Sequence, residues 1–177
     1  MRSFSNALAA INSMKEAGVI EEYAVAGAMA VLFWSEPIPT FDLDVLVFLP
    51  PSPERLVSLQ PIYDWARSHR YPAAAEHIVI DDVPTQFVPS PNALSDEAIR
   101  TAETLDYDGT PVRVVRPEYL IALFLEPGAK TPNRRERAAT LLHWPGLNRA
   151  LVDDILKRHG LSFQGAGRRR GPPTPVR

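Results

Sequence analysis

The stretch PTFDLDVLVFLP, residues 39–50, places two acidic side chains in an otherwise apolar segment. Its β-branched and aromatic residues lie between prolines and predict a β-strand over 41–49. Because side chains at positions i and i+2 of a strand share a face, we expect Asp42 and Asp44 to point the same way. Three apolar side chains occupy the opposite face, where they would fill a core: Leu43, Val45 and Val47.

Two ionised carboxylates this close repel each other, and both pKa values rise unless a cation compensates. A divalent cation such as Mg²⁺ (or Mn²⁺) takes oxygen ligands and leaves coordination places open for phosphate oxygens. Asp42 and Asp44 are therefore candidate metal ligands and catalytic residues, with a nucleoside triphosphate (NTP) as the substrate that the metal would hold. The alternative is a pair of acids that faces solvent at the edge of a sheet.

The segment just before the acids, YAVAGAMAVLFW, predicts a strand over 21–27 and a buried helix over 28–34. Gly27 falls at the junction, where glycine lets the backbone approach a ligand closely. A helix N-terminus also offers free N–H groups and the positive end of its dipole to a phosphate. Gly27 and Ala28 are therefore candidate nucleotide-binding residues.

Elsewhere the chain shows helical and hairpin patterns but no internal repeat. Apolar spacing and cap signals predict helices over 4–17, 53–69, 92–102, 117–126, 133–144 and 147–159, the second of them interrupted or restarted near Pro61. Two hairpins are expected, with turns at Asp81-Asp82 and Asp108-Gly109. This order predicts an α/β (α+β) fold with one mixed β-sheet. We expect an α/β core over 1–116 and a helical C-terminal part of the same domain over 117–163.

Length and composition favour a single soluble domain. The 177 residues suffice for a real core, and the lack of cysteine excludes disulfides and thiolate metal sites. Lys15 and Glu16 interrupt what would have to be the apolar core of a signal peptide, and no segment is apolar enough to span a membrane. The net charge of −2 indicates little about partners. We expect a cytoplasmic protein without a membrane partner.

The last residues, GAGRRRGPPTPVR, predict a flexible basic tail over 164–177. Such a tail is typical of a solvated chain end. Its arginines could alternatively contact nucleic acid phosphates, which would make the chain a nucleic-acid-binding module.

The order strand, glycine, helix, loop and Asp-x-Asp resembles the nucleotidyltransferase superfamily, which has the polymerase-beta-like fold. It is most similar to stand-alone bacterial members related to AbiEii-type toxins. The resemblance rests on Gly27-Ala28, on Thr40 just before the acid pair, and on Asp42 and Asp44. It continues more diffusely through VPTQFV, GTPVRVVRPEYLIAL and RRERAATLL, so it covers most of residues 4–159.

The resemblance implies transfer of a nucleoside monophosphate from Mg-NTP to a hydroxyl of an RNA, a protein or a small molecule. It also implies a role as the toxin of a toxin–antitoxin system, with an antitoxin as partner. Thr40 and Arg134 would then join the nucleotide site. Arg134 lies three residues before Arg137, and the two could clamp phosphates or form a solvated helix face.

Several positions depart from the family pattern. Gln86 stands where the family brings a third carboxylate; as a candidate catalytic residue it could coordinate a cation but could not act as a base. Ala28 lacks the hydroxyl common at the turn, Phe124 replaces a frequent lysine, and Ile38 a frequent arginine. Glu76 is an alternative third acid, whereas Asp81 and Asp82 fit turn chemistry better. The scattered histidines are predicted to be surface or helix-end residues: His69, His77, His143 and His159.

Two readings therefore remain open for the site. An active nucleotidyltransferase is favoured by the turn and the acid pair. A catalytically impaired member, acting as a nucleotide sensor or binding partner, is what Gln86 and Ala28 would predict.

Overall fold

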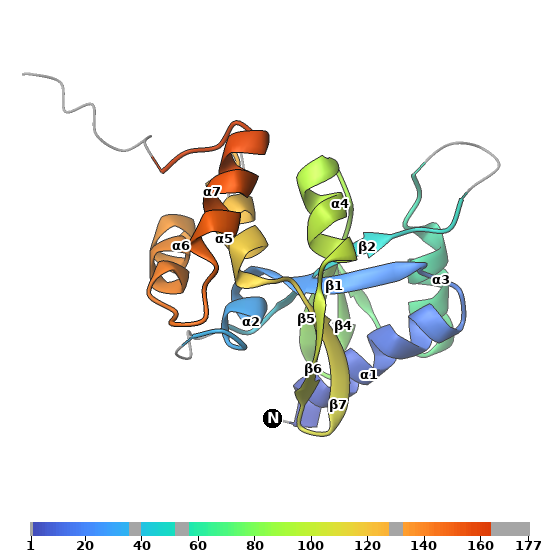
Figure 1. Ribbon diagram of the computed structural model, residues 1–177. Coiled ribbons are helices and arrows are strands. Elements are labelled where there is room, and N and C mark those ends of the chain that lie inside the picture. The colour runs from blue at the N-terminus through green and yellow to red at the C-terminus, as the bar shows by residue number, and fades with distance from the viewer. Residues whose placement is uncertain (1, 36–39, 52–56, 128–132, 164–177) are drawn as a thin grey trace, which may run out of the picture.

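A computed structural model describes residues 2–35, 40–51, 57–127 and 133–163, with only the backbone for 2 and 3 (Figure 1). The basic tail and the position of Ile38 lie outside the described residues. The strands are β1 (Glu22–Ala26), β2 (Leu43–Phe48), β3 (Ala73–Ala74), β4 (His77–Ile80), β5 (Val83–Pro89), β6 (Glu103–Tyr107) and β7 (Thr110–Val114). The helices are α1 (Arg2–Glu16), α2 (Gly27–Val31), α3 (Gln60–Ser68), α4 (Ala93–Arg100), α5 (Pro117–Leu125), α6 (Arg134–Leu142) and α7 (Arg149–Arg158).

All seven strands form one sheet in the order β3-β4-β5-β2-β1-β7-β6. The acid-bearing β2 lies at its centre, antiparallel to β1 and parallel to β5. β1 also runs parallel to β7, and each outer edge is an antiparallel hairpin. The predicted mixed sheet is therefore confirmed.

The two faces of β2 differ as the alternation predicts. Leu43, Val45 and Val47 are buried. They share their face with Tyr23, which pairs with Val47 and whose hydroxyl donates a hydrogen bond to Asn12 of α1 (2.6 Å). Phe48 lies on the other face, where the Arg100 guanidinium of α4 stacks 5.0 Å above its ring. Asp44 shares this second face because it lies four residues before Phe48.

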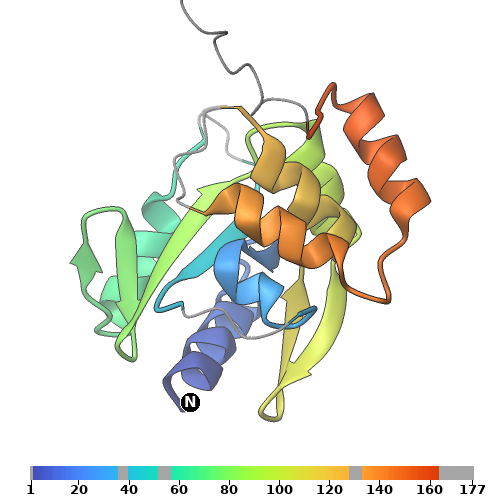
Figure 2. The ribbon, with the colours of Figure 1, turned by 90° about the vertical axis from the view of Figure 1, so that its left-hand side faces the viewer.

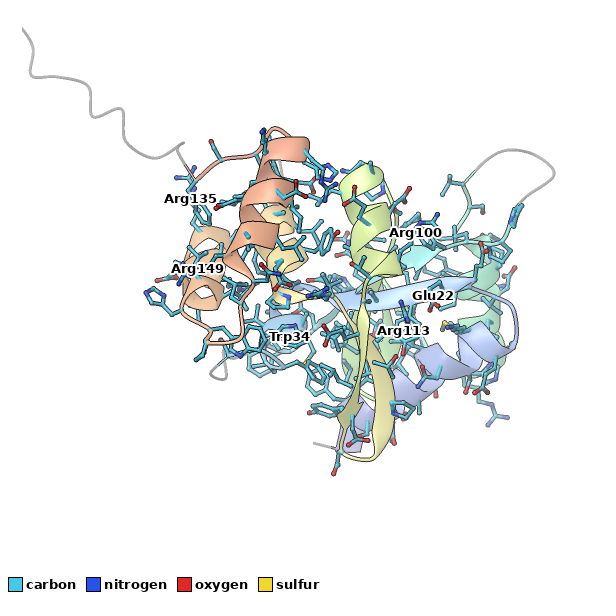
Figure 3. All side chains as sticks on the ribbon, viewed as in Figure 1. Glu22, Trp34, Arg100, Arg113, Arg135 and Arg149 are labelled. Carbon is cyan, nitrogen blue, oxygen red and sulfur yellow. The ribbon has the colours of Figure 1, made fainter. Side chains whose placement is uncertain are left out.

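The N-terminal helix is tied to the sheet by an ion-pair cluster at the start of β1. Glu22 accepts hydrogen bonds from Lys15 of α1 (2.8 Å) and lies 3.2 Å from the Arg113 guanidinium of β7. Figure 3 shows Glu22 and Arg113 close together. Burial opposes ionisation of Glu22, but the hydrogen bonds from Lys15 and the Tyr23 N–H, with the charge of Arg113, hold its pKa below the usual range. The cluster fixes how β1 enters the sheet.

The predicted turns and helix ends are mostly confirmed. Asp81, Asp82, Asp108 and Gly109 all have positive φ, as hairpin turns of this length require. The Asn92 side chain caps α4 by accepting a hydrogen bond from the Ser95 N–H (3.0 Å), and Pro117 opens α5. His69, His143 and His159 each follow the last residue of a helix.

The C-terminal helices pack together beside the sheet. α5 contacts α6 and α7, and α2 contacts both α5 and α6. Figure 2 shows α5 and α6 side by side above α2. Seven of the nine residues of α5 are buried, including Phe124, because the helix is enclosed by these neighbours. No helix within the described ranges is long and apolar enough to cross a membrane.

Two predicted boundaries were wrong. β2 begins at Leu43, so Asp42 precedes the strand. α2 ends at Val31, because Leu32, Phe33 and Trp34 form a turn whose N–H groups bond three residues back. α3 begins at Gln60, in agreement with the predicted restart near Pro61, and this proline lies at the start of the helix where its missing donor costs nothing. Residues 57–59 are not helical, and residues 52–56 lie outside the described ranges.

Candidate active site

Asp44 lies directly against the glycine turn. The last residue of β1, Ala26, pairs with Asp44, and the chain turns at Gly27 with φ +61° into α2. A β-carbon on Gly27 would lie 2.8 Å from Cγ of Asp44 and 3.0 Å from its Cβ, with Oδ2 closer still. Only glycine therefore permits both this turn and the observed position of the Asp44 carboxylate.

The Asp44 carboxylate is half-buried and accepts no hydrogen bond from any residue in the described ranges. Burial raises its pKa above the usual range, and the charge of Asp42 raises it further. The positive charges of Arg137 and His77 act in the opposite direction. A carboxylate kept partly from water without a donor is expected to bind a cation, since a cation removes the cost of its charge.

Asp42 is exposed and is oriented by Thr40. The Thr40 hydroxyl donates a hydrogen bond of 2.8 Å to Oδ1 of Asp42. Thr40 was predicted to touch the nucleotide; the structure instead brings its hydroxyl to the carboxylate, which leaves Oδ2 without this contact. The nucleotide-binding role of Thr40 stays a prediction, and the contact observed is one that would orient a metal ligand.

A row of side chains crosses the sheet from Asp44. Asp44 pairs with Gln86 of β5, and Gln86 pairs with His77 of β4. Directly paired residues project from the same face of a sheet, about 4.8 Å apart per strand. Gln86 is therefore next to Asp44, as the resemblance implied for the third acidic position, and His77 follows it on the same face.

A pocket of about 530 Å³ opens over this face, beside Asp42. Continuing the β2–β5 register by one residue places Asp42 beside Pro84, which pairs with Val79. Asp42, Pro84 and Val79 of this row line the pocket, together with His77 and Ala74 of the next row. Thr40 and Phe41, which precede β2, and Arg137 of α6 complete the lining within the described residues. Asp42 thus lies at the wall of a cavity large enough for part of a substrate, and Asp44 lies beyond this lining on the same face of the sheet.

Of the two arginines on α6, Arg137 reaches this pocket. Its Nε is buried without a hydrogen-bond partner among the described residues, and its charge acts on Asp44. The Arg134 guanidinium instead donates hydrogen bonds to the carbonyl oxygens of Leu123 and Glu126 (3.0 Å for the latter) at the end of α5. The phosphate role predicted for Arg134 stays a prediction, and the structure does not bring this side chain to the pocket.

The remaining predicted residues lie as follows. Ala28 is buried, so only its backbone could face a ligand. Glu76 is exposed in the turn between β3 and β4, and Asp81 and Asp82 form the turn after β4. None of these three acids lines the pocket. Phe124, at the position of a frequent lysine, is buried in α5.

The donor set at the acid pair fits a divalent cation. It consists of two carboxylates: Thr40 holds that of Asp42 in place, and no residue in the described part of the chain donates a hydrogen bond to that of Asp44. The described residues contain no group of three or more His, Cys, Asp or Glu side chains placed to hold a metal. A cation here would therefore complete its coordination with phosphate oxygens and water.

His77 was not predicted as a site residue from the sequence, whereas Arg137 was predicted only together with Arg134, as one of two arginines that could clamp phosphates. The hairpin turn at Asp81-Asp82 already implies that His77 pairs with Gln86, so this signal was present. Arg137 depends on how α6 packs against α5 and α2, which the local sequence does not specify.

Comparisons with known proteins locate the fold. No family model and no curated protein matches the chain significantly. Among solved structures it is similar to an antigenic nucleotidyltransferase-like protein from Paracoccidioides brasiliensis, with 13% identity, 89% of this chain and 87% of that chain covered, and a TM-score of 0.55.

The antibiotic-resistance factor ANT(2'')-Ia is similar in two structures. Its solution structure shares 16% identity over 90% of this chain and 93% of that chain, with a TM-score of 0.52. Its crystal structure in complex with adenylyl-2''-tobramycin shares 17% identity over 88% of this chain and 98% of that chain, with a TM-score of 0.51. The protein therefore has the fold of nucleotidyltransferase-like proteins.

Proposed function

We propose that this protein is a nucleotidyltransferase that binds a Mg²⁺-bound (or Mn²⁺-bound) NTP at Asp42 and Asp44. The observation that carries the proposal is the Asp44 carboxylate, which is half-buried, lies next to a second acid, packs closely against Gly27 and accepts no hydrogen bond from the described residues. Such a carboxylate costs stability in a protein that has no use for it. A cation that binds together with the NTP would remove this cost, which gives the carboxylate a function.

Each neighbouring residue then has a defined task. Thr40 holds Oδ1 of Asp42, so that the other oxygen faces the cation. The turn at Gly27 keeps backbone rather than side chain beside the phosphates, since Ala28 is buried and offers no hydroxyl. Arg137, with its unpaired Nε, offers a guanidinium to the phosphate oxygens. The cation, when bound, offsets the charge that develops on the phosphates.

The reaction is an in-line displacement at the α-phosphorus. The oxygen of an acceptor hydroxyl forms a bond to this phosphorus, and the bond from phosphorus to the bridging oxygen breaks. Pyrophosphate leaves with the electron pair, and the hydroxyl proton passes to a base. The product is the acceptor carrying a nucleoside monophosphate.

One of the similar solved structures supports a particular class of acceptor. ANT(2'')-Ia was solved with adenylyl-2''-tobramycin, an adenylylated small molecule, which supports a small hydroxyl compound as acceptor. The resemblance to AbiEii-type toxins would instead give a bacterial, cytoplasmic toxin with an RNA or protein acceptor and an antitoxin. Both belong to the same proposed chemistry, and the assay below separates them.

One observation favours a second candidate function. Gln86 pairs directly with Asp44, where a third carboxylate would complete the site, and an amide cannot act as a base. A protein with this change could bind Mg-NTP as a sensor or binding partner without transferring anything.

The test is transfer of label from each of four α-labelled NTPs, with Mg²⁺ or Mn²⁺, into total RNA, total protein and tobramycin. Asp42→Asn and Asp44→Asn serve as blanks, and Asp153→Asn, an exposed acid on α7, is the matched control. The proposal expects label in one acceptor class that disappears in both blanks but not in the control. Absence of label with Mg-NTP binding intact would support the sensor; label that persists in both blanks would place the chemistry elsewhere.

A further inference from the structure

On the face of the sheet that carries Asp44, the described pocket lining contains one imidazole side chain, that of His77. His77 is half-buried, lines the pocket, and lies two strand spacings, about 10 Å, from Asp44. This separation leaves room for a phosphorus atom and an attacking hydroxyl between the metal-binding acids and the imidazole. The residue between them, Gln86, cannot take a proton.

Among the described residues, Asp42, just before β2, and Arg137 of α6 line the same pocket as His77, and Asp44 of β2 interacts with its charge. The neighbouring Glu76 is exposed in the turn before β4. The strands paired to β4 contribute Ala74 and Gln86, which carry no charge. No described residue forms an ion pair or a hydrogen bond with the His77 ring, so within the described ranges its nitrogens are open to a substrate.

The other pocket residues cannot accept the proton of a hydroxyl at neutral pH. Arg137 stays protonated, and the Thr40 hydroxyl already donates its hydrogen bond to Asp42. Four further lining residues have apolar side chains: Phe41, Ala74, Val79 and Pro84. Asp42 is assigned to the cation. Imidazole is also the side chain that most often performs this task in enzymes.

We infer that His77 is the catalytic base of this protein and that the pocket over β4 and β5 receives the acceptor. The inference rests on the proposed nucleotidyl transfer. As the acceptor oxygen bonds to the α-phosphorus, its proton moves to a ring nitrogen of His77, while pyrophosphate leaves with the electrons of the broken bond. His77 of β4 would thus accept the proton in place of a carboxylate at position 86 of the neighbouring strand β5.

The experiment follows the release of pyrophosphate from each of four α-labelled NTPs and the fate of the α-label. Water is an acceptor that is always present, and tobramycin, total RNA and total protein are added as further probes. His77→Gln keeps a polar side chain of similar reach, and His143→Gln, at the exposed end of α6, is the matched control. Calorimetric binding of Mg-ATP shows that each variant is folded and that its acid pair works.

The expected result is a rate about a hundred- to ten-thousand-fold lower for His77→Gln, with unchanged Mg-ATP affinity and no change for His143→Gln. The wild-type rate falls on acidification, because an imidazolium cannot accept a proton, and this dependence disappears in His77→Gln. Adding Gln86→Glu to His77→Gln restores transfer, because a carboxylate then stands in the same row. A merely structural role would move neither the pH profile nor this rescue.

Two results overturn the inference, and they differ from each other. If the wild type transfers and His77→Gln retains both its rate and its pH profile, His77 is not the base and the proposed function still holds. If the wild type releases no pyrophosphate with any NTP when water, tobramycin, total RNA or total protein is the acceptor, the proposed function fails and the inference fails with it.

Discussion

Gly27 and Asp44 exclude any side chain between them: a β-carbon built on Gly27 would come within 2.8 Å of the Asp44 carboxyl carbon. The glycine also has φ +61°, a conformation that costs other residues about 1–2 kcal/mol. The end of β1 and the acid on β2 are therefore coupled. Any change at position 27 must move the carboxylate that is proposed to bind the cation.

Gly27→Ala should consequently lower both stability and Mg-NTP affinity. Gly18→Ala is the matched control, because Gly18 has φ +71° but no atom within 4 Å of its added β-carbon. Both variants should lose about 1–2 kcal/mol of unfolding free energy through φ, measured by urea titration, and Gly27→Ala should lose more through the contact. Only Gly27→Ala should weaken Mg-NTP binding. Equal losses in the two variants, with binding intact, would contradict the coupling.

Asp44→Asn should stabilise the protein in the absence of metal. Burial, and then the charge of Asp42, raise the pKa of Asp44, so the folded state holds this proton more tightly than the unfolded chain does. The ionised group therefore destabilises the folded state above the raised pKa, and the penalty fades as pH falls to the unfolded value. The melting temperature of Asp44→Asn should exceed that of the wild type at neutral pH and approach it in acid.

Ligand should reverse this order. With Mg-NTP at about 100 times its dissociation constant, the wild type should gain about 2.7 kcal/mol and Asp44→Asn almost none. Asp153→Asn, which changes an exposed acid, should behave as the wild type does in both measurements. A lower melting temperature for metal-free Asp44→Asn at neutral pH would show that the carboxylate has a structural partner instead.

The sequence was sufficient to predict the mixed sheet and the two faces of β2. Strict alternation around Asp44 separates Leu43 and Val45 from the acid, and burial follows this pattern. The two-residue turn at Asp81-Asp82 likewise determines that His77 faces Gln86. These features depend on local periodicity and turn length, both of which can be determined from the order of the residues.

Other parts of the site depend on long-range packing and could not be predicted in this way. Arg134 and Arg137 are one turn apart on α6 and look equivalent in the sequence. The carbonyl groups at the end of α5 engage Arg134, because the two helices pack together, and Arg137 is left to reach the pocket. The contact from Thr40 to Asp42 forms in the segment just before β2, which begins two residues later than the pattern predicts.

Thr40→Ala should weaken the metal site without unfolding the protein. Loss of the hydrogen bond to Asp42 leaves this carboxylate free to rotate, and such outer contacts typically contribute about 10- to 100-fold in metal affinity. Mn²⁺ binding followed by electron paramagnetic resonance, with nucleotide present, measures this effect. Thr104→Ala, at an exposed position of β6, should leave Mn²⁺ affinity unchanged. Unchanged affinity in Thr40→Ala would show that Asp42 needs no support.

Arg137→Gln should weaken NTP binding by about 10- to 100-fold, the effect of losing a hydrogen bond between charged groups. Arg135→Gln is the control, since Arg135 is exposed on the outer side of the helical part (Figure 3). Arg134→Gln should instead lower the melting temperature, because it removes donors from the α5 carbonyl groups. The reverse pattern, with binding lost in Arg134→Gln alone, would return the phosphate role to Arg134.

The central claim is that Asp42 and Asp44 together hold a cation-bound nucleotide. Its most direct test is a calorimetric titration of the wild type, Asp42→Asn and Asp44→Asn with a non-hydrolysable NTP analogue, with and without Mg²⁺. The account predicts Mg²⁺-dependent binding to the wild type that both substitutions abolish. Binding of equal affinity in all three proteins, or binding that does not depend on Mg²⁺, would contradict it.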